Sequence, residues 1–159
     1  MKSALRLQMA TALACGLLAA LPQARAAGTV QVDWLQPDRY ADAGRSVVDR
    51  ERTMQELSRH LVALGARLPD GQTLRLDVLD LDLAGEIEWN ARGELRILRG
   101  RADWPHMTLR YTLTSGGQTL KSGEASLADM HYFFSPRDAA LAYEKRMLDR
   151  WFRDTFAAR

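Results

Sequence analysis

The sequence predicts an α+β domain with a mainly antiparallel sheet of about five strands and two amphipathic helices on one face of that sheet. In two segments the apolar residues recur at steps of three and four, which is the spacing of a helix. In several others they alternate with polar residues, as in strands that are buried on one side. The predicted order is strand, helix, about four strands and helix, and 159 residues suffice for one such domain.

The first two elements follow from local patterns. Residues 30–35 alternate between apolar and polar and predict a strand. Ser46, with Asp49 three residues later, forms a capping box and predicts the beginning of a helix. Gly65 and Pro69 mark the end of this helix. Its apolar face has helical spacing (Met54, Leu57, Leu61, Leu64 and Leu68).

Residues 73–84 predict a strand that is interrupted by a β-bulge. The apolar residues occupy even positions up to Val78 and odd positions from Leu79 onward. One extra residue at this point would keep both sets on the core face. The same shift gathers four charged residues on the opposite face (Arg75, Asp77, Asp80 and Asp82).

Turn signals predict a turn and a hairpin in the second half of the chain. Residues 90–93 form the first turn and precede a short strand at 95–98. Gly116-Gly117 follows the regular alternation of 107–114 and predicts a two-residue hairpin turn. The pattern shifts again near Gly123, which predicts a second bulge in the return strand.

The last helix is predicted to begin at Ser135-Pro136, because serine is a preferred cap and proline suits the first helical position. Its apolar face is wide and aromatic (Leu141, Tyr143, Met147, Leu148, Trp151, Phe152 and Phe156), which suits packing across a sheet. The four tryptophans are few and scattered, so we assign them to core packing (Trp34, Trp89, Trp104 and Trp151).

Residues 1–26 have the pattern of a secretory signal peptide. Lys2 and Arg6 precede an apolar run, and Ala24-Arg25-Ala26 matches a cleavage site. We therefore expect cleavage near Ala26, a single domain over 27–159, no transmembrane span in the mature chain, and a periplasmic or secreted location. A retained membrane anchor is the alternative, although the run is short for a bilayer.

Removal of this segment changes the charge of the protein. The whole chain has 22 basic and 20 acidic residues, a formal charge of +2. Three basic residues and no acid leave with the signal, so 19 basic residues remain against 20 acidic ones. This balance, together with export, argues against nucleic acid as a partner. Cys15, the single cysteine, lies within the signal in A-L-A-C, which loosely resembles a lipidation motif, so lipidation of Cys15 is an alternative fate.

Several stretches together resemble a family of exported proteins from Gram-negative bacteria, the Domain of Unknown Function family number 3016. They are V-Q-V-D-W-L with the following P-D, the D-L-D-L-A-G segment, D-W-P from Asp103, A-D-M before Tyr132, and Y-E-K-R-M-L before Trp151-Phe152. The resemblance spans essentially all of 27–159. It implies export and a single small domain, and it implies no catalytic or ligand residue.

The acidic face of the bulged strand is a candidate metal site (Asp77, Asp80 and Asp82). The spacing D-x-D-x-x-G imitates the beginning of an EF-hand loop, but Ala84 and Ala91 stand where oxygen ligands are needed. We therefore expect a solvated face whose acids pair with arginines on neighbouring strands, such as Arg96 or Arg110.

A second group flanks the Gly116-Gly117 hairpin at comparable distances from its turn (Asp103, His106, Asp129 and His131). Such residues can hold a divalent metal or act as an acid–base pair. Strand alternation and pairing place Asp103 opposite His131 on the core side. We therefore predict a hydrogen bond between these two side chains, with a structural role.

The chain has none of the common hydrolase motifs and no phosphate-binding loop, and residues 27–159 contain no cysteine. Together with export, this favours a non-enzymatic periplasmic binding or envelope-accessory domain. Its partner would be an envelope protein, a lipid or a small ligand, and we expect no cofactor. The alternative is a hydrolase or metal-binding protein that uses the Asp/His group.

Overall fold

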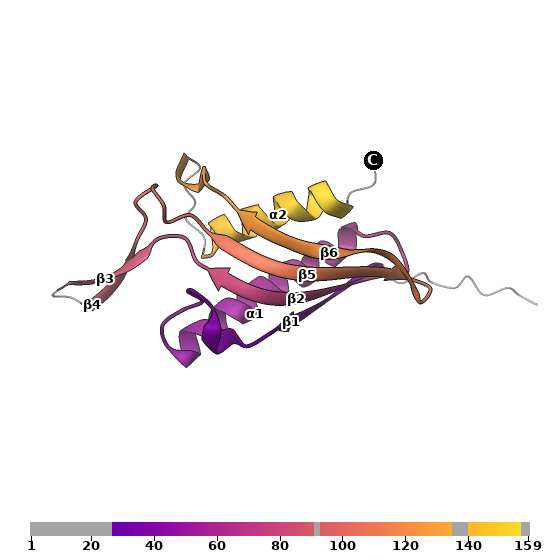
Figure 1. Ribbon diagram of the computed structural model, residues 1–159, viewed down its shortest axis with the longest axis horizontal. Coiled ribbons are helices and arrows are strands. Elements are labelled where there is room, and N and C mark those ends of the chain that lie inside the picture. The colour runs from indigo at the N-terminus through magenta and orange to yellow at the C-terminus, as the bar shows by residue number, and fades with distance from the viewer. Residues whose placement is uncertain (1–26, 91–92, 135–139, 157–159) are drawn as a thin grey trace, which may run out of the picture.

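The computed structural model describes residues 27–90, 93–134 and 140–156. It confirms the α+β class, with two helices behind a four-stranded sheet and a small two-stranded sheet at one end (Figure 1). The six strands of the described residues correct the expected count of about five. The predicted signal peptide, its cleavage site and Cys15 lie outside the described residues.

The main sheet has the strand order β1-β2-β5-β6. Its strands are β1 (Thr29–Trp34), β2 (Gln72–Asp82), β5 (His106–Ser115) and β6 (Gln118–Ala128). β1 runs parallel to β2, because helix α1 (Val47–Leu64) carries the chain back between them, and the other pairs are antiparallel. β1 and β6 are therefore the two edges of the sheet.

β2 contains the predicted bulge. Its register with β5 shifts between Val78 and Asp80, so one residue is added to β2 at Leu79. The apolar residues on both sides of the bulge are buried, as predicted (Leu74, Leu76, Val78, Leu81 and Leu83). Leu79, the added residue itself, was also predicted on the core face but is only half-buried and lies outside the core cluster.

The β5–β6 hairpin turns at Gly116-Gly117, as predicted, and both glycines have positive φ angles, which glycine adopts without steric cost. The second bulge is not at Gly123, because the register shifts between Leu113 and Thr114, close to the turn. Gly123 lies opposite Tyr111, and a Cβ atom there would come within 2.9 Å of the Tyr111 hydroxyl. The glycine thus permits a close approach rather than a bulge.

Helix α1 begins as predicted, since the Ser46 hydroxyl accepts a hydrogen bond from the Asp49 N–H at 3.0 Å. Helix α2 (Ala142–Phe156) begins later than predicted. Leu141, directly before it, has a φ of 54°, a left-handed conformation that cannot continue an α-helix. The predicted start at Ser135-Pro136 lies outside the described residues.

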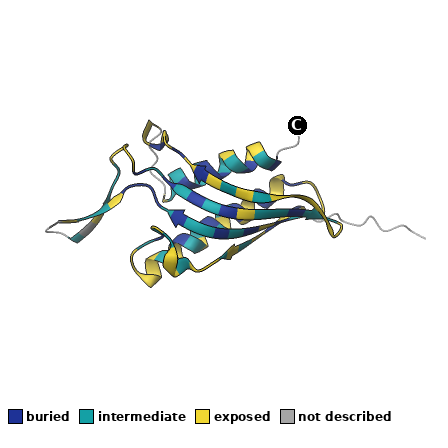
Figure 2. Ribbon diagram, viewed as in Figure 1, coloured by how far each residue is buried: buried dark blue, intermediate teal, exposed yellow. Residues whose placement is uncertain are grey.

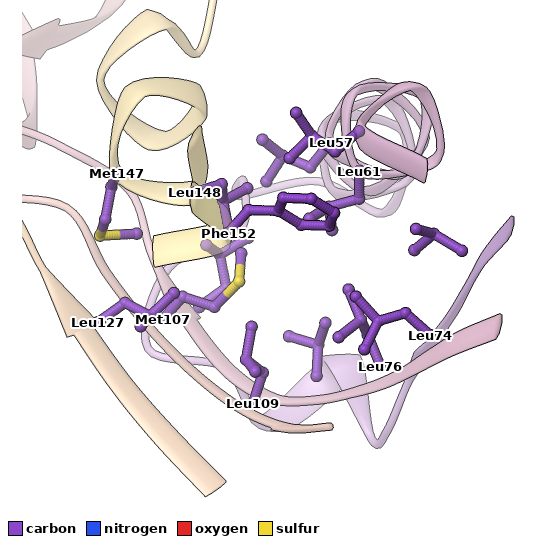
Figure 3. Close-up of a cluster of buried hydrophobic side chains, with 14 of the residues drawn as sticks. Leu57, Leu61, Leu74, Leu76, Met107, Leu109, Leu127, Met147, Leu148 and Phe152 are labelled. Atoms are coloured by element: carbon purple, nitrogen blue, oxygen red, sulfur yellow. The ribbon is translucent and has the colours of Figure 1, made fainter. Parts of the chain in front are cut away.

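The core lies between the helices and the sheet, where both helices cover the same face (Figure 3). It is formed mainly by leucines of α1 and the strands together with larger side chains of α2 (Leu57, Leu61, Leu74, Leu76, Leu109, Leu148 and Phe152). Each such side chain contributes about 1.5–3 kcal/mol on burial. Buried and exposed residues alternate along the strands, because the face of the sheet away from the helices is open (Figure 2).

The second sheet is a hairpin of β3 (Glu86–Asn90) and β4 (Gly93–Ile97) that projects beyond the end of the main sheet (Figure 1). Short 3-10 turns lie at η1 (Pro37–Arg39), η2 (Gly65–Arg67) and η3 (Tyr132–Phe134). In the described part of the chain, neither helix has the length and hydropathy needed to cross a membrane.

Candidate functional site

The acids of β2 take part in contacts across the open face of the sheet. Asp77 accepts a hydrogen bond from Nε of Arg75 at 3.1 Å, and Arg75 also pairs with Asp33 on β1 at 2.9 Å. Arg110 lies beside Asp77 in register and pairs with Glu124 on β6 at 3.5 Å. Charged residues of opposite sign thus form a row across all four strands. Within the described residues, no three His, Cys, Asp or Glu side chains are placed to hold a metal ion.

Asp80 and Asp82 lie where the loop after β1 meets the end of β2. Oδ1 of Asp80 accepts a hydrogen bond from the Ala41 N–H at 3.0 Å. Asp42 forms a β-bridge with Asp82, which brings two acids together. Burial, followed by the charges of Asp42 and Asp80, raises the pKa of Asp82 above its ordinary value.

Asp82→Asn should therefore increase the free energy of unfolding at pH 7, by less than about 1 kcal/mol because the site is partly screened by solvent. The folded-state pKa exceeds the unfolded one, so the ionised carboxylate costs free energy above the folded pKa. The cost disappears as the pH falls below the ordinary value of 3.8. Urea unfolding at pH 7 and pH 3 measures this difference.

Asp77→Asn is the matched control on the same face. It should give no such gain, because the Asp77 carboxylate accepts a hydrogen bond from Arg75. Equal gains for Asp82→Asn at both pH values would contradict the electrostatic cause.

The four residues beside the Gly116-Gly117 hairpin have separate surroundings. Asp129 pairs with Arg146 of α2 through two hydrogen bonds, at 3.0 and 2.6 Å. Nε2 of His106 lies 2.9 Å from the Ser126 hydroxyl. Asp103 is buried, whereas His131 is exposed.

The predicted hydrogen bond between Asp103 and His131 is wrong. Asp103 accepts hydrogen bonds from the N–H groups of Arg99 and Arg101 at 2.6 and 2.8 Å, and the Tyr132 hydroxyl also bonds to it. The His131 ring lies instead beside Phe134. Regular β5–β6 strand pairing ends at His106 and Ala128, so strand alternation no longer orients the side chains beyond these residues.

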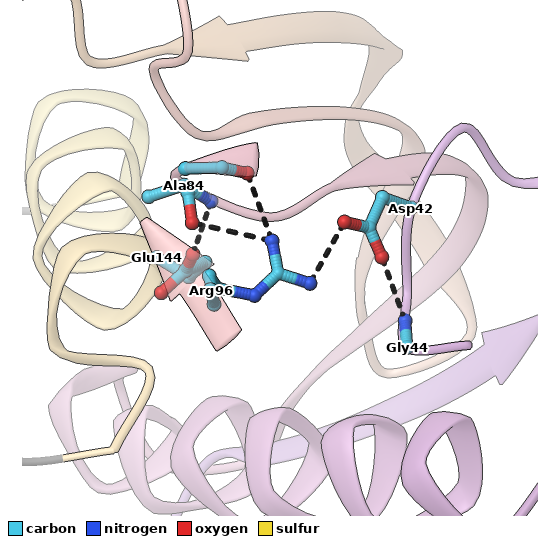
Figure 4. A network of polar contacts seen from close by, with 6 residues as sticks. Asp42, Gly44, Ala84, Arg96 and Glu144 are labelled. Atoms are coloured by element: carbon cyan, nitrogen blue, oxygen red, sulfur yellow. Dashed lines mark hydrogen bonds and ion pairs between the residues drawn. The ribbon is translucent and has the colours of Figure 1, made fainter. Parts of the chain in front are cut away.

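Sequence reasoning missed a polar network at the base of the β3–β4 hairpin (Figure 4). Nη1 of Arg96 donates to the carbonyls of Ala84 and Gly85 at 3.3 and 2.9 Å, and Nη2 donates to Asp42 at 2.7 Å. Glu144 of α2 accepts a hydrogen bond from the Ala84 N–H at 2.9 Å. The network joins β4, the end of β2, the loop before α1 and the beginning of α2, so it fixes the hairpin to the body.

Glu144 is 3% exposed, and burial raises its pKa, opposed by the Ala84 N–H. It lines a cleft of about 220 Å³, and Leu83, Arg96 and Leu141 line both this cleft and a second one of about 440 Å³. A buried acid beside a cavity is a frequent feature of binding sites. One sequence signal could have revealed it: Glu144 stands three residues before Met147, on the apolar face of α2.

Large exposed apolar side chains gather at the end of the molecule that carries the β3–β4 hairpin. Trp89 is 69% exposed and Leu95 is 53% exposed, which corrects the assignment of Trp89 to the core. The residues around η3 add three more, because Met130 is 62%, Phe133 46% and Phe134 83% exposed. We call these five residues the apolar end.

The two parts of the apolar end are connected. Arg99 forms an ion pair with Glu88 of β3. The next residue, Gly100, packs so closely on the Phe133 ring that a Cβ atom would come within 2.7 Å of it. The Gly100 N–H also donates to the Tyr132 hydroxyl at 3.2 Å. The loop before β5 therefore joins the hairpin to η3.

Comparison with known proteins identifies the family of the chain. The family model described as Protein of unknown function (DUF3016) matches residues 28–154, which is most of the chain. No curated protein and no solved structure matches the chain. The match agrees with the resemblance of the sequence motifs, and the chain belongs to the DUF3016 family.

Proposed function

We propose that the protein is a non-enzymatic periplasmic binding domain that docks a protein partner on the apolar end. The observation that carries the proposal is that five large exposed apolar residues lie on two connected segments at one end of the molecule, with Trp89 and Leu95 on opposite faces of the hairpin. Exposed apolar side chains that lie close together often mark interaction sites in soluble domains, and Met130, Phe133 and Phe134 are such a group at η3. The signal-like pattern of residues 1–26 supports the location.

The charges beside the patch favour a protein over an anionic lipid surface. Glu86 is exposed on the same hairpin as Trp89 and Leu95. Glu88 of β3 lies directly opposite Leu95 of β4. An anionic lipid surface would repel the exposed carboxylate of Glu86, whereas the carboxylate of Glu88 is paired with Arg99. Aromatic residues such as Trp89 are also enriched among the residues that dominate protein interfaces.

The contacts of the Asp/His group support binding rather than hydrolysis. Asp103 is engaged with backbone N–H groups, and Asp129 is engaged with Arg146. Carboxylates with these partners act as structural acceptors, because a general base needs access to the proton that it removes.

Site-specific photo-cross-linking in intact cells tests the proposal. A photoreactive phenylalanine analogue at Trp89, Leu95 or Phe134 should yield the same cross-linked protein, which mass spectrometry identifies. Leu120 is the matched control, because it is 53% exposed, as is Leu95, but lies next to the β5–β6 turn. This turn lies at the opposite end of the sheet from the β3–β4 hairpin (Figure 1). The same product from Leu120, or no product from the apolar end, would contradict the proposal.

A further inference from the structure

We infer that the outer edge of β6, with the cleft beside it, is a strand-addition site for an extended peptide. This site is separate from the apolar end and uses a different chemistry. An edge strand presents unpaired backbone N–H and C=O groups, and another extended backbone complements them all at once. The occupant we propose is therefore a peptide segment in β conformation with one apolar side chain for the cleft.

The register shows which backbone groups face outward. The Asp129 N–H donates to the Pro105 carbonyl at 3.3 Å, one position beyond the last paired residues. This bond shows that the odd-numbered residues near this end direct their N–H and C=O groups toward β5. The even-numbered residues direct theirs away from the sheet (Ser122, Glu124, Ser126 and Ala128). All four are exposed, and in the described part of the chain no strand pairs with this edge.

β6 lacks two devices that often protect an edge strand, a proline and a bulge within residues 122–128. It has 11 residues without a proline, and its bulge lies close to the turn, away from residues 122–128. The single lysine of β6, Lys121, does not extend along the edge, because its amine donates a hydrogen bond to the Thr155 carbonyl at the end of α2. Among the described residues, β6 is thus a long and regular edge to which no strand is paired.

Helix α2 runs beside β6 and forms a cleft of about 240 Å³ with it. Leu127 of β6 together with Met147 and Trp151 of α2 provides its apolar lining, while Arg150 and Asp154 lie among its polar residues. An added strand would direct alternate side chains toward the helix layer, so one of them could enter this cleft. A strand edge beside a helix supplies affinity through the backbone and selectivity through the pocket.

The test uses a phage library that displays random twelve-residue peptides, selected on the 27–159 chain. Selected peptides should share an apolar residue at one position. Glu124→Pro and Ser126→Pro should each weaken binding at least about tenfold, because proline removes an outward N–H without breaking the ladder to β5. Glu124→Ala and Ser126→Ala are the matched controls and should bind within about twofold of wild type, since the backbone donors remain.

If a proline variant fails to fold, amide hydrogen exchange of the wild-type protein, measured with and without a selected peptide, still tests the inference. Peptide binding should slow exchange at Ser122, Glu124 and Ser126, whereas amides already bonded to β5 should change little. Thr155→Trp, which fills the cleft, should also weaken binding at least about tenfold. Selected peptides that protect other amides, a library without a binder, or pairing of two β6 edges in a dimer of this chain would each overturn the inference.

Discussion

Replacing Asp129 by asparagine should lower the free energy of unfolding by about 3 kcal/mol, because it breaks a buried ion pair. Asp129 is 1% exposed, and its Oδ2 accepts hydrogen bonds from Nε and Nη2 of Arg146. Arg146 also donates to the Tyr132 carbonyl at 3.2 Å, so the pair joins α2 to the turn after β6. Asparagine would leave the guanidinium without its counter-charge. Urea unfolding at pH 7 measures the loss.

Arg150→Gln is the control for this prediction. Nη2 of Arg150 lies 3.6 Å from Oδ1 of Asp129 without a hydrogen bond, and its side chain is 49% exposed. Its loss should cost less than about 1 kcal/mol, as for exposed pairs. A double-mutant cycle of Asp129→Asn with Arg146→Gln should give a coupling of at least about 1 kcal/mol. If Asp129→Asn lowered the free energy of unfolding no more than Arg150→Gln does, the structural role of Asp129 would be contradicted and a functional role favoured.

Asp103→Asn should lower the free energy of unfolding by about 2 kcal/mol at pH 7, because the amide cannot accept all the hydrogen bonds that the carboxylate accepts. The carboxylate bonds to the N–H groups of Arg99 and Arg101 and to the Tyr132 hydroxyl. These contacts hold the loop that connects the hairpin to η3. The variant should therefore also reduce cross-linking from Phe134.

The effect of Asp103 should depend on pH in a defined direction. Burial would raise its pKa, but the Arg99 N–H, the Tyr132 hydroxyl and the Arg101 N–H outweigh burial and hold the pKa below its ordinary value of 3.8. A depressed folded-state pKa stabilises the protein above the unfolded pKa, and this stabilisation is lost as the pH falls through the folded one. The unfolding free energies of wild type and Asp103→Asn should therefore differ at pH 7 and converge as the pH falls through the lowered folded-state pKa of Asp103.

His131→Ala is the control for Asp103. The exposed imidazole should contribute less than about 0.5 kcal/mol. If His131→Ala and Asp103→Asn lowered the free energy of unfolding equally, the result would favour the hydrogen bond between Asp103 and His131 that the sequence predicted.

The side-chain contacts of Asp103 could not be predicted from the strand pattern. Pairing from the Gly116-Gly117 turn correctly predicted that one extra residue would be added to β6, although not at Gly123. It failed for the Asp103 and His131 side chains, because both lie beyond the paired residues. There the loop conformation, rather than the two-residue period of a strand, directs each side chain. The neighbour of His131, Tyr132, reaches Asp103 instead.

The local patterns by themselves determined much of the fold. The Ser46 cap, the bulge of β2 and the glycine turn of the β5–β6 hairpin each depend on a few adjacent residues. Hydrogen bonds within a turn, steric limits on φ and the period of apolar residues act over such short distances. These features can therefore be predicted from the sequence alone.

Only the tertiary structure decided the contacts between distant segments. Asp129 and Arg146, Glu144 and Ala84, and Arg96 and Asp42 meet because the helices and the hairpin pack against one end of the sheet. The exposure of the apolar end and the free edge of β6 likewise depend on which elements cover which surfaces. Burial and pairing of this kind are properties of the assembled chain, since each partner is supplied by a segment remote in sequence.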